Sequence, residues 1–379
     1  MRLLPLFVFW WLWFLNFFTR SSLSPILPLI EDTLSLSHGE AGGLITSYSV
    51  GYAATMLIAG RFVSAWGYKR TVVAGITGIG IILIALQWAE HYVAFHVLSL
   101  LLGLASGAYM PSIVSIITET YDHPQWGKAI GLHDSAASVA IFLAPILIAF
   151  GVQFLPWKRI LLLVGIACLI LPLFFWKVST EPTPKVSHLG SHYLNLFRRR
   201  PIWIMALLCI LSSASYMGVY SMLPLYLIKE RGMEYSFANN LFGISRVGGI
   251  AVQIFIGFLT DRYGYRRILM LSLLTTGLST LSLSIAPTFS LLLIALFLQA
   301  ALSLAFFPVA LAAIARLTSP EERSMGIGAI ISSGVIFGMG SAPLLLGIVA
   351  DHFSFQTGIL WMGILTTFSS FMARYLNQD

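Results

Sequence analysis

Two stretches of this chain, IGFLTDRYGYRR at residues 256–267 and IAGRFVSAWGYKR at 58–70, share one pattern. Each has a glycine, a polar residue four positions later, and then Gly-Tyr followed by two basic residues. The second copy carries Asp261 where the first copy carries Ser64. A turn that occurs twice indicates a duplicated fold. The loss of the acid from one copy indicates that the two copies differ in function.

The composition is that of a membrane protein. Of the 379 residues, 58% are hydrophobic and 10% are charged, whereas a soluble domain carries roughly 25% charged residues. The apolar runs are too long and continuous for barrel strands, which alternate over about 10 residues, so the membrane spans must be helices. Both cysteines, Cys168 and Cys209, fall in predicted spans, which excludes a disulfide framework.

Stretches of the length needed to cross a bilayer, about 20 apolar residues, recur along the whole chain. The first is read as an uncleaved helix, since no small-residue cleavage site follows it. The gaps are short, so neighbouring helices should be antiparallel hairpins. The predicted spans are 3–30, 41–65, 71–89, 92–120, 127–153, 157–178, 201–228, 237–260, 266–286, 288–316, 325–350 and 354–376. We therefore predict an all-α membrane protein with twelve transmembrane helices.

The repeat extends well beyond the loop. SPILPLIED at 24–32 matches YSMLPLYLI at 220–228, AIFLAPIL at 140–147 matches GMGSAPLL at 338–345, and Pro111 pairs with Pro308. The offset between partners is nearly constant across these stretches. This predicts an N-terminal six-helix bundle (1–178), a polar, basic cytoplasmic linker (179–200) and a C-terminal six-helix bundle (201–379). Paired bundles of this kind suit rocking around a site at the membrane midplane.

The distribution of basic residues orients the chain, because cytoplasmic loops carry an excess of Lys and Arg. With the N-terminus in the cytoplasm, most basic residues fall inside. Lys158, Arg159, Lys229 and Arg231 fall outside. We predict a multi-pass plasma-membrane protein, in the inner membrane of a bacterium, with both termini cytoplasmic. Topology also accounts for the net charge of +7, so we predict no nucleic-acid partner.

The repeated loop resembles the signature between helices 2 and 3 of the major facilitator superfamily (MFS). The resemblance covers essentially the whole chain in helix count, repeat and linker position, and it implies two pseudo-symmetric bundles. Within the span 127–153, Gly131, Ala140, Ala144 and Pro145 have the spacing of an antiporter-type pattern in which alanine replaces two glycines. The predicted gating motif comprises Gly257, Asp261, Arg262, Gly264, Arg266 and Arg267 in the second copy, and Gly60, Gly67 and Arg70 in the first.

In the family, the acid of this loop helps to hold the cytoplasmic side shut, and the resemblance assigns that role to Asp261 and Arg262. Gly257 should allow two helices to approach closely, and Gly264 should permit a tight turn. Ser64 cannot supply the charge. We therefore expect the loop of the second bundle to hold the cytoplasmic side shut more strongly than the loop of the first. The alternative is that Ser64 is a neutral replacement in a tolerant loop.

Four ionisable residues fall inside predicted spans rather than at their ends: Arg20, Arg246, His133 and Asp134. A charge at the bilayer centre costs ~2.5–3.5 kcal/mol on insertion scales, and such residues usually face a watery cavity. Arg20 could instead extend to the headgroups, and Asp134 could cap its helix or pair with Arg20.

Helical spacing places polar side chains on common faces with these charges. Asn16, Arg20 and Ser24 form one stripe, and Ser212, Tyr216 and Tyr220 form its counterpart in the second half. The polar and aromatic members could alternatively pack against one another. The predicted substrate-binding residues are Arg20, Arg246, Tyr216, Tyr220, Gln253, Tyr52, Asn16 and Gln299. Asp134 and His133 are the predicted proton-coupling residues.

Two arginines against one carboxylate favour a small organic anion, because the guanidinium fork suits carboxylate or phosphate. Arg20 is also similar in placement to the arginine of organic-anion and organophosphate carriers in the MFS. We predict a monomeric secondary transporter, by proton symport, with anion exchange left open, and neither an enzyme nor a protein with a cofactor or metal. The alternatives are a proton-driven efflux antiporter for drugs or metabolites and a non-transporting membrane sensor. The sequence does not name the anion or the direction of its flux.

If only the second loop holds the cytoplasmic side shut through a charge, Asp261→Asn should lower transport more than Ser64→Ala does. Initial uptake rates in proteoliposomes measure both variants against the wild-type protein. Equal losses would contradict the asymmetry.

Overall fold

The computed structural model describes residues 3–181, 198–319 and 322–376, and within these ranges it contains helices and no strands. The remainder of the predicted linker, 182–197, lies outside the described residues. Helices occur at every predicted span, and nine stretches among the described residues are long and apolar enough to cross a membrane. The prediction of an all-α membrane protein is therefore confirmed among the described residues.

Several predicted spans are divided by turns or by π-helical segments. The first half contains α1 (Leu3–Leu34), α2 (His38–Trp66), α3 (Tyr68–Ala85), α4 (Tyr92–Gly107), α5 (Tyr109–Thr120), α6 (Trp126–Gly151) and α7 (Trp157–Val178). The second half contains α9 (Arg200–Ser213), η3 (Ala214–Gly218), α10 (Val219–Leu225), η4 (Tyr226–Glu230), α11 (Tyr235–Ile244), α12 (Gly248–Tyr263), α13 (Tyr265–Ile285), α14 (Phe289–Leu302), α15 (Phe306–Leu317), α16 (Arg323–Ser333), η6 (Gly334–Gly340), α17 (Ser341–His352) and α18 (Phe355–Ser370).

The paired prolines explain one symmetric pair of breaks. Pro111 and Pro308 each occupy the third position of a helix, α5 and α15, directly after the preceding helix ends. Proline has no backbone N–H and cannot continue a helix from the turn before it. The repeat detected in the sequence therefore includes the position at which a span is interrupted.

The chain forms two compact units. Unit 1 comprises Met1–Leu36, Ser47–Ser187 and Glu234–Gly243, and unit 2 comprises Ser37–Thr46, His188–Met233 and Ile244–Asp379. Each unit thus takes a short segment from the other half of the sequence. The predicted bundle boundaries at 178 and 201 stay a prediction.

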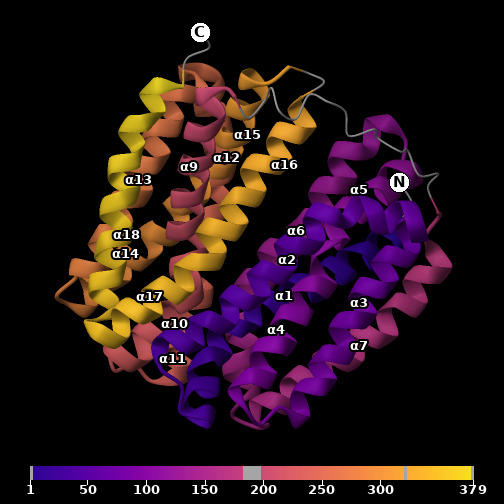
Figure 1. The fold of residues 1–379 in the computed structure, drawn as a ribbon, viewed down its shortest axis with the longest axis horizontal. Coiled ribbons are helices and arrows are strands. Elements are labelled where there is room, and N and C mark those ends of the chain that lie inside the picture. The colour runs from indigo at the N-terminus through magenta and orange to yellow at the C-terminus, as the bar shows by residue number, and fades with distance from the viewer. Residues whose placement is uncertain (1–2, 182–197, 320–321, 377–379) are drawn as a thin grey trace. The chain divides into compact units, whose positions relative to one another are not determined.

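Unit 1 is held together by close backbone contacts. In Figure 1, α3 and α7 run side by side, and α1 packs against both α6 and α7. A Cβ added at Gly51 would collide with the carbonyl oxygen of Leu100, and one at Gly103 would collide with the carbonyl oxygen of Tyr48. Only glycine lets α2 and α4 approach this closely, which increases van der Waals contact between helices in lipid.

Glu234 caps the N-terminus of α11, which belongs to unit 1. Its carboxylate accepts hydrogen bonds from the backbone N–H groups of Ser236 (2.8 Å) and Phe237 (2.7 Å). These two donors stabilise the ionised form and lower the pKa of Glu234. The cap is therefore complete above the ordinary carboxyl pKa and is lost as the pH falls through the lowered value.

Unit 2 packs α13 against α18, again through glycines, and includes the first turn of α2 (Figure 1). Asp351, on α17, accepts hydrogen bonds from the backbone N–H groups of His38 (2.7 Å) and Gly39 (2.8 Å). The first N–H groups of a helix have no partner inside that helix. The carboxylate of Asp351 therefore completes the N-terminus of α2 from another part of the chain.

Gly103→Ala should destabilise the protein by about 1–3 kcal/mol, the usual cost of an extra methyl group in a packed interface. Gly131→Ala is the matched control, because a Cβ at Gly131 meets no atom within 4 Å and alanine is the better helix former. Thermal unfolding midpoints in one detergent should fall for the first variant and stay level or rise for the second. A Gly103→Ala midpoint equal to that of the control would contradict the packing argument.

Candidate functional site

Arg20 lies on α1 within a group of aromatic rings in unit 1. Its guanidinium carbon is 5.6 Å from the ring centroid of Phe17 and 5.5 Å from that of Tyr52 on α2. Tyr52 in turn stacks on Tyr48, with ring centroids 6.2 Å apart. A cation over a ring face is attracted by the quadrupole of the ring. The structure therefore brings together two of the predicted binding residues, Arg20 and Tyr52, and leaves both half-buried.

Asn16, one turn before Arg20, is buried and tied to the backbone. Its Nδ2 donates to the carbonyl oxygen of Ser106 at 3.3 Å. Ser106 is the second-last residue of α4, where carbonyl groups lack a helical donor. The amide of Asn16 therefore satisfies part of the break between α4 and α5, a structural role that the sequence alone did not indicate.

The predicted proton-coupling residues lie in different environments. His133 is fully buried, and its Nε2 lies 3.2 Å from the hydroxyl of Tyr109. That hydroxyl donates to the carbonyl oxygen of Phe9 at 3.1 Å, so it accepts from His133, whose Nε2 carries the proton. Asp134 is exposed and accepts a hydrogen bond from Nε1 of Trp13 at 3.2 Å. The two neighbours are linked through Trp13, which stacks on His133 with centroids 5.8 Å apart.

Arg246 lies in unit 2 at a break in its helix rather than within a continuous span. The chain turns at Ser245–Val247, between α11 and α12, and the N–H of Gly249 donates to the carbonyl oxygen of Arg246 at 3.2 Å. The guanidinium carbon lies 4.5 Å from the ring centroid of Tyr220 on α10. Arg246 is 5% exposed and Tyr220 is 1% exposed. The predicted residues Arg246 and Tyr220 therefore form one buried cluster.

Of the other predicted residues of unit 2, Tyr216 and Gln299 lie at the π-helical segment η3. Tyr216 belongs to η3 and is half-buried, as is Gln253 on α12. Gln299, on α14, is fully buried and its Nε2 donates to the carbonyl oxygen of Ser215 at 2.9 Å. The side-chain amide of Gln299 is thus bonded to the backbone of η3. π-Helical turns are often found at functional sites.

The two copies of the loop have the same backbone form. Gly67 joins α2 to α3 with φ 86°, and Gly264 joins α12 to α13 with φ 82°. A positive φ is cheap only for glycine, so both turns depend on it. The expectation for Gly257 is not met, because a Cβ there, or at Gly60, meets no atom within 4 Å. Asp261, Arg262, Arg267 and Arg70 are exposed, and Arg266 is half-buried.

An acid from outside the first loop, Glu181, contacts that loop, and sequence analysis did not find it. Both carboxylate oxygens of Glu181 accept from the backbone N–H of Lys69, at 3.3 and 3.2 Å. Nζ of Lys69 donates to the carbonyl oxygen of Ser179 at 3.0 Å and lies over the ring of Trp176. The negative charge thus caps the N-terminus of α3, where the helix dipole favours it. Only the packing of α3 on α7 reveals this pairing, because Glu181 is far from the loop in sequence.

Gly67→Ala should therefore cost more stability than Gly264→Ala. Both variants cost about 1–3 kcal/mol, because both glycines combine a positive φ with an extended ψ that alanine rarely adopts. A Cβ at Gly67 would also lie 2.6 Å from Oε1 of Glu181, which displaces a cap worth about 0.5–2 kcal/mol. Unfolding midpoints of both variants, each alone and combined with Glu181→Ala, provide the measurement. The excess cost of Gly67→Ala should vanish in the Glu181→Ala background, which has neither the cap nor the steric conflict, and its persistence there would contradict the argument.

Comparisons with known proteins agree with this fold. The chain is 26% identical over 364 residues to "Uncharacterized MFS-type transporter YuxJ" of Bacillus subtilis, covering 90% of this chain and 91% of the relative. It is 24% identical over 368 residues to "Gallate transporter" of Pseudomonas putida, covering 85% and 81%. A bacterial homologue of the lysosomal transporter Spinster superposes with a TM-score of 0.84 at 14% identity, covering 98% of this chain and 96% of the other.

The family model described as Major Facilitator Superfamily matches residues 9–251 and 235–378, which together span nearly the whole chain. Its relatives and structural neighbours are transporters rather than enzymes. The chain is a multi-pass membrane transporter and belongs to the Major Facilitator Superfamily.

Proposed function

We propose that the chain moves a small organic anion, a carboxylate or a phosphate ester, across the membrane by alternating access coupled to proton symport. The single observation that carries this proposal is the pair of arginines within spanning segments, each beside a tyrosine ring: Arg20 by Tyr52 and Arg246 by Tyr220. Arginine is charged at every physiological pH. Placing a charged side chain inside the bilayer costs free energy, so such residues usually face a cavity and take part in binding or transport.

The surroundings of Arg246 favour an anion in particular. The turn at Ser245–Val247 directly precedes the N-terminus of α12, and Gly248 and Gly249 follow it. A helix N-terminus carries partial positive charge, and discontinuous helices of transporters direct such ends at anionic substrate groups. The proposal therefore assigns Arg246 and the start of α12 to recognition of the anionic group, and Arg20 to the same task from unit 1.

The relatives include proteins named for organic anions. One is the gallate transporter, and another, 23% identical over 266 residues, is named "Hexuronate transporter" of Bacillus subtilis. A further relative, 22% identical over 364 residues, is named "Multidrug resistance protein 2" of the same organism. The relatives alone thus leave the substrate class open, and the guanidinium groups of half-buried Arg20 and buried Arg246 favour the anion.

Asp134 is the proposed proton carrier. Its carboxylate accepts from Trp13 Nε1 and has no basic side chain within ion-pair distance among the described residues. Trp13 lies on α1, two turns before Arg20 and on the same face. A change in the charge of Asp134 would therefore act on the helix that carries Arg20. This arrangement is the physical basis on which we propose coupling.

The experiment is a thermal-shift screen of purified protein against small carboxylates, phosphate esters and lipophilic cations, followed by uptake of the stabilising compound into proteoliposomes. Arg20→Ala and Arg246→Ala should each lower uptake at least tenfold while keeping the fold, because each removes a charge-assisted contact. Arg231→Ala is the matched control outside the proposed site. Stabilisation by cations alone would favour the efflux alternative, and uptake at the wild-type rate in both arginine variants would exclude the proposed anion site.

Coupling is tested in the same proteoliposomes with Asp134→Asn. An inward proton gradient should no longer drive accumulation of the anion, whereas exchange of internal for external anion should continue, because exchange needs no proton. Asp122→Asn, in the loop before α6, is the control. Accumulation that still responds to the gradient in Asp134→Asn would remove this residue from the proton path.

A further inference from the structure

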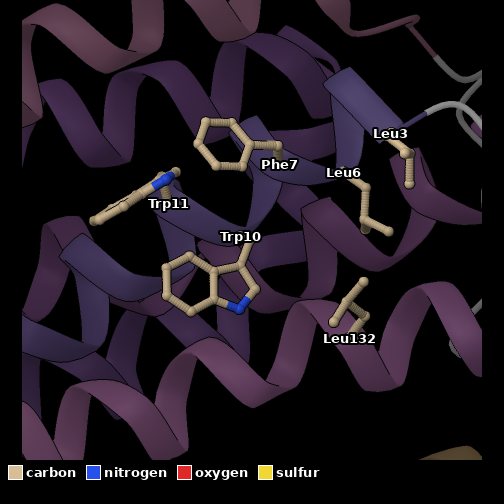
Figure 2. A pocket seen from close by; sticks show the side chains of 6 residues that line it. All are labelled: Leu3, Leu6, Phe7, Trp10, Trp11 and Leu132. Carbon is tan, nitrogen blue, oxygen red and sulfur yellow. The ribbon is translucent and has the colours of Figure 1, made fainter.

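An apolar groove lies between the first turns of α1 and the start of α6 in unit 1, next to His133 and Asp134 in the sequence but apart from the two arginines of the proposed substrate site. Its volume is about 560 Å³, and Figure 2 shows the six side chains that line it: Leu3, Leu6, Phe7, Trp10 and Trp11 from α1, and Leu132 from α6.

The lining of the groove is almost entirely apolar. Four of its six side chains are hydrocarbon and the other two are the indole rings of Trp10 and Trp11, of which Trp10 donates its Nε1 proton to Ser135 Oγ at 3.0 Å. Leu3 is 71% exposed, Phe7 60% and Leu132 47%. A groove of this composition and size gains free energy from an apolar occupant in proportion to the area that the occupant covers.

The length of the groove matches one leaflet of the membrane. From Leu3 to Trp11 the helix rises about 12 Å, compared with about 15 Å for half of the hydrocarbon core. By the predicted orientation this is the cytoplasmic leaflet. Arg20 lies about 13 Å further along α1 than Trp11, so a small substrate held at Arg20 would not reach the groove.

Lys128 gives the cytoplasmic end of the groove a positive charge. It precedes Leu132 by four residues on α6, so the two side chains are neighbours on one face of the helix. Lys128 is exposed and has no hydrogen bond or ion pair among the described residues. A basic residue at this depth attracts anionic headgroups.

We propose that this groove binds one acyl chain of an anionic phospholipid from the cytoplasmic leaflet, with the headgroup phosphate beside Lys128. The occupant is a lipid because the lining is apolar, the depth is that of a leaflet and the charge lies at the headgroup end. The site is distinct from the proposed substrate site and does not depend on the identity of the transported compound.

Native mass spectrometry of delipidated protein tests the proposal, with phosphatidylglycerol and phosphatidylcholine of identical acyl chains as probes. Leu132→Trp fills the groove and should weaken binding of the first phosphatidylglycerol at least fivefold. Lys128→Gln should weaken phosphatidylglycerol about fivefold, the usual effect of one basic residue near an anionic surface, and leave phosphatidylcholine unchanged. Leu173→Trp and Lys177→Gln, on exposed positions of α7, are the matched controls and should bind as the wild-type protein does.

A second variant guards against misfolding of the first. Phe7→Ala removes one wall of the groove at a side chain that is 60% exposed, so it should weaken the same lipid without opening a cavity in the core. Unchanged phosphatidylglycerol affinity in Leu132→Trp and Phe7→Ala would overturn the acyl-chain site. An equal loss of both lipids in Lys128→Gln would overturn the headgroup contact. Arg246→Ala should bind the lipid normally even where it no longer transports, which separates this proposal from the proposed function.

Discussion

The structure depends on one constraint: a backbone N–H or C=O group inside a bilayer needs a partner within the protein. Continuous helices meet this requirement by themselves, and the breaks in this chain need additional groups. The carbonyl at the end of α4 accepts from Asn16, and the carbonyl of Ser215 in η3 accepts from Gln299. Two side chains that polarity alone marked as ligands are thus explained first by the irregular backbone that they satisfy.

The same constraint explains why the arginines and the aromatic rings occur together. A guanidinium group in a spanning segment loses its hydrating water, which costs free energy. Its attraction to the face of an aromatic ring offsets part of that cost without introducing a second charge. Arg20 and Arg246 both have this arrangement, although their backbones differ: α1 continues past Arg20, whereas the chain turns at Arg246. In both places the guanidinium group therefore lies against an aromatic ring of its own unit.

The sequence predicted the fold well because its signals are local and repeated. Hydropathy located the spans, and the matched prolines marked the repeat, although the interruptions at these prolines were not predicted. The turn at Arg246 was missed, because Ile-Ser-Arg-Val-Gly-Gly is apolar enough to be read as a continuous helix. The burial of His133 was missed because helical periodicity does not say which neighbouring helix covers a face. Glu181 was missed because its partner is the backbone N–H of Lys69, and a backbone group cannot be recognised as a binding partner from residue types.

The position of Glu181 has a mechanical consequence for the connection between the two halves. Glu181 lies in the predicted linker, three residues after the last residue of α7, and its carboxylate is bonded to the first turn of α3. A force applied at Glu181 would therefore act on α3 through this carboxylate as well as on α7 through the main chain. The two neighbouring helices of unit 1 would respond to it together.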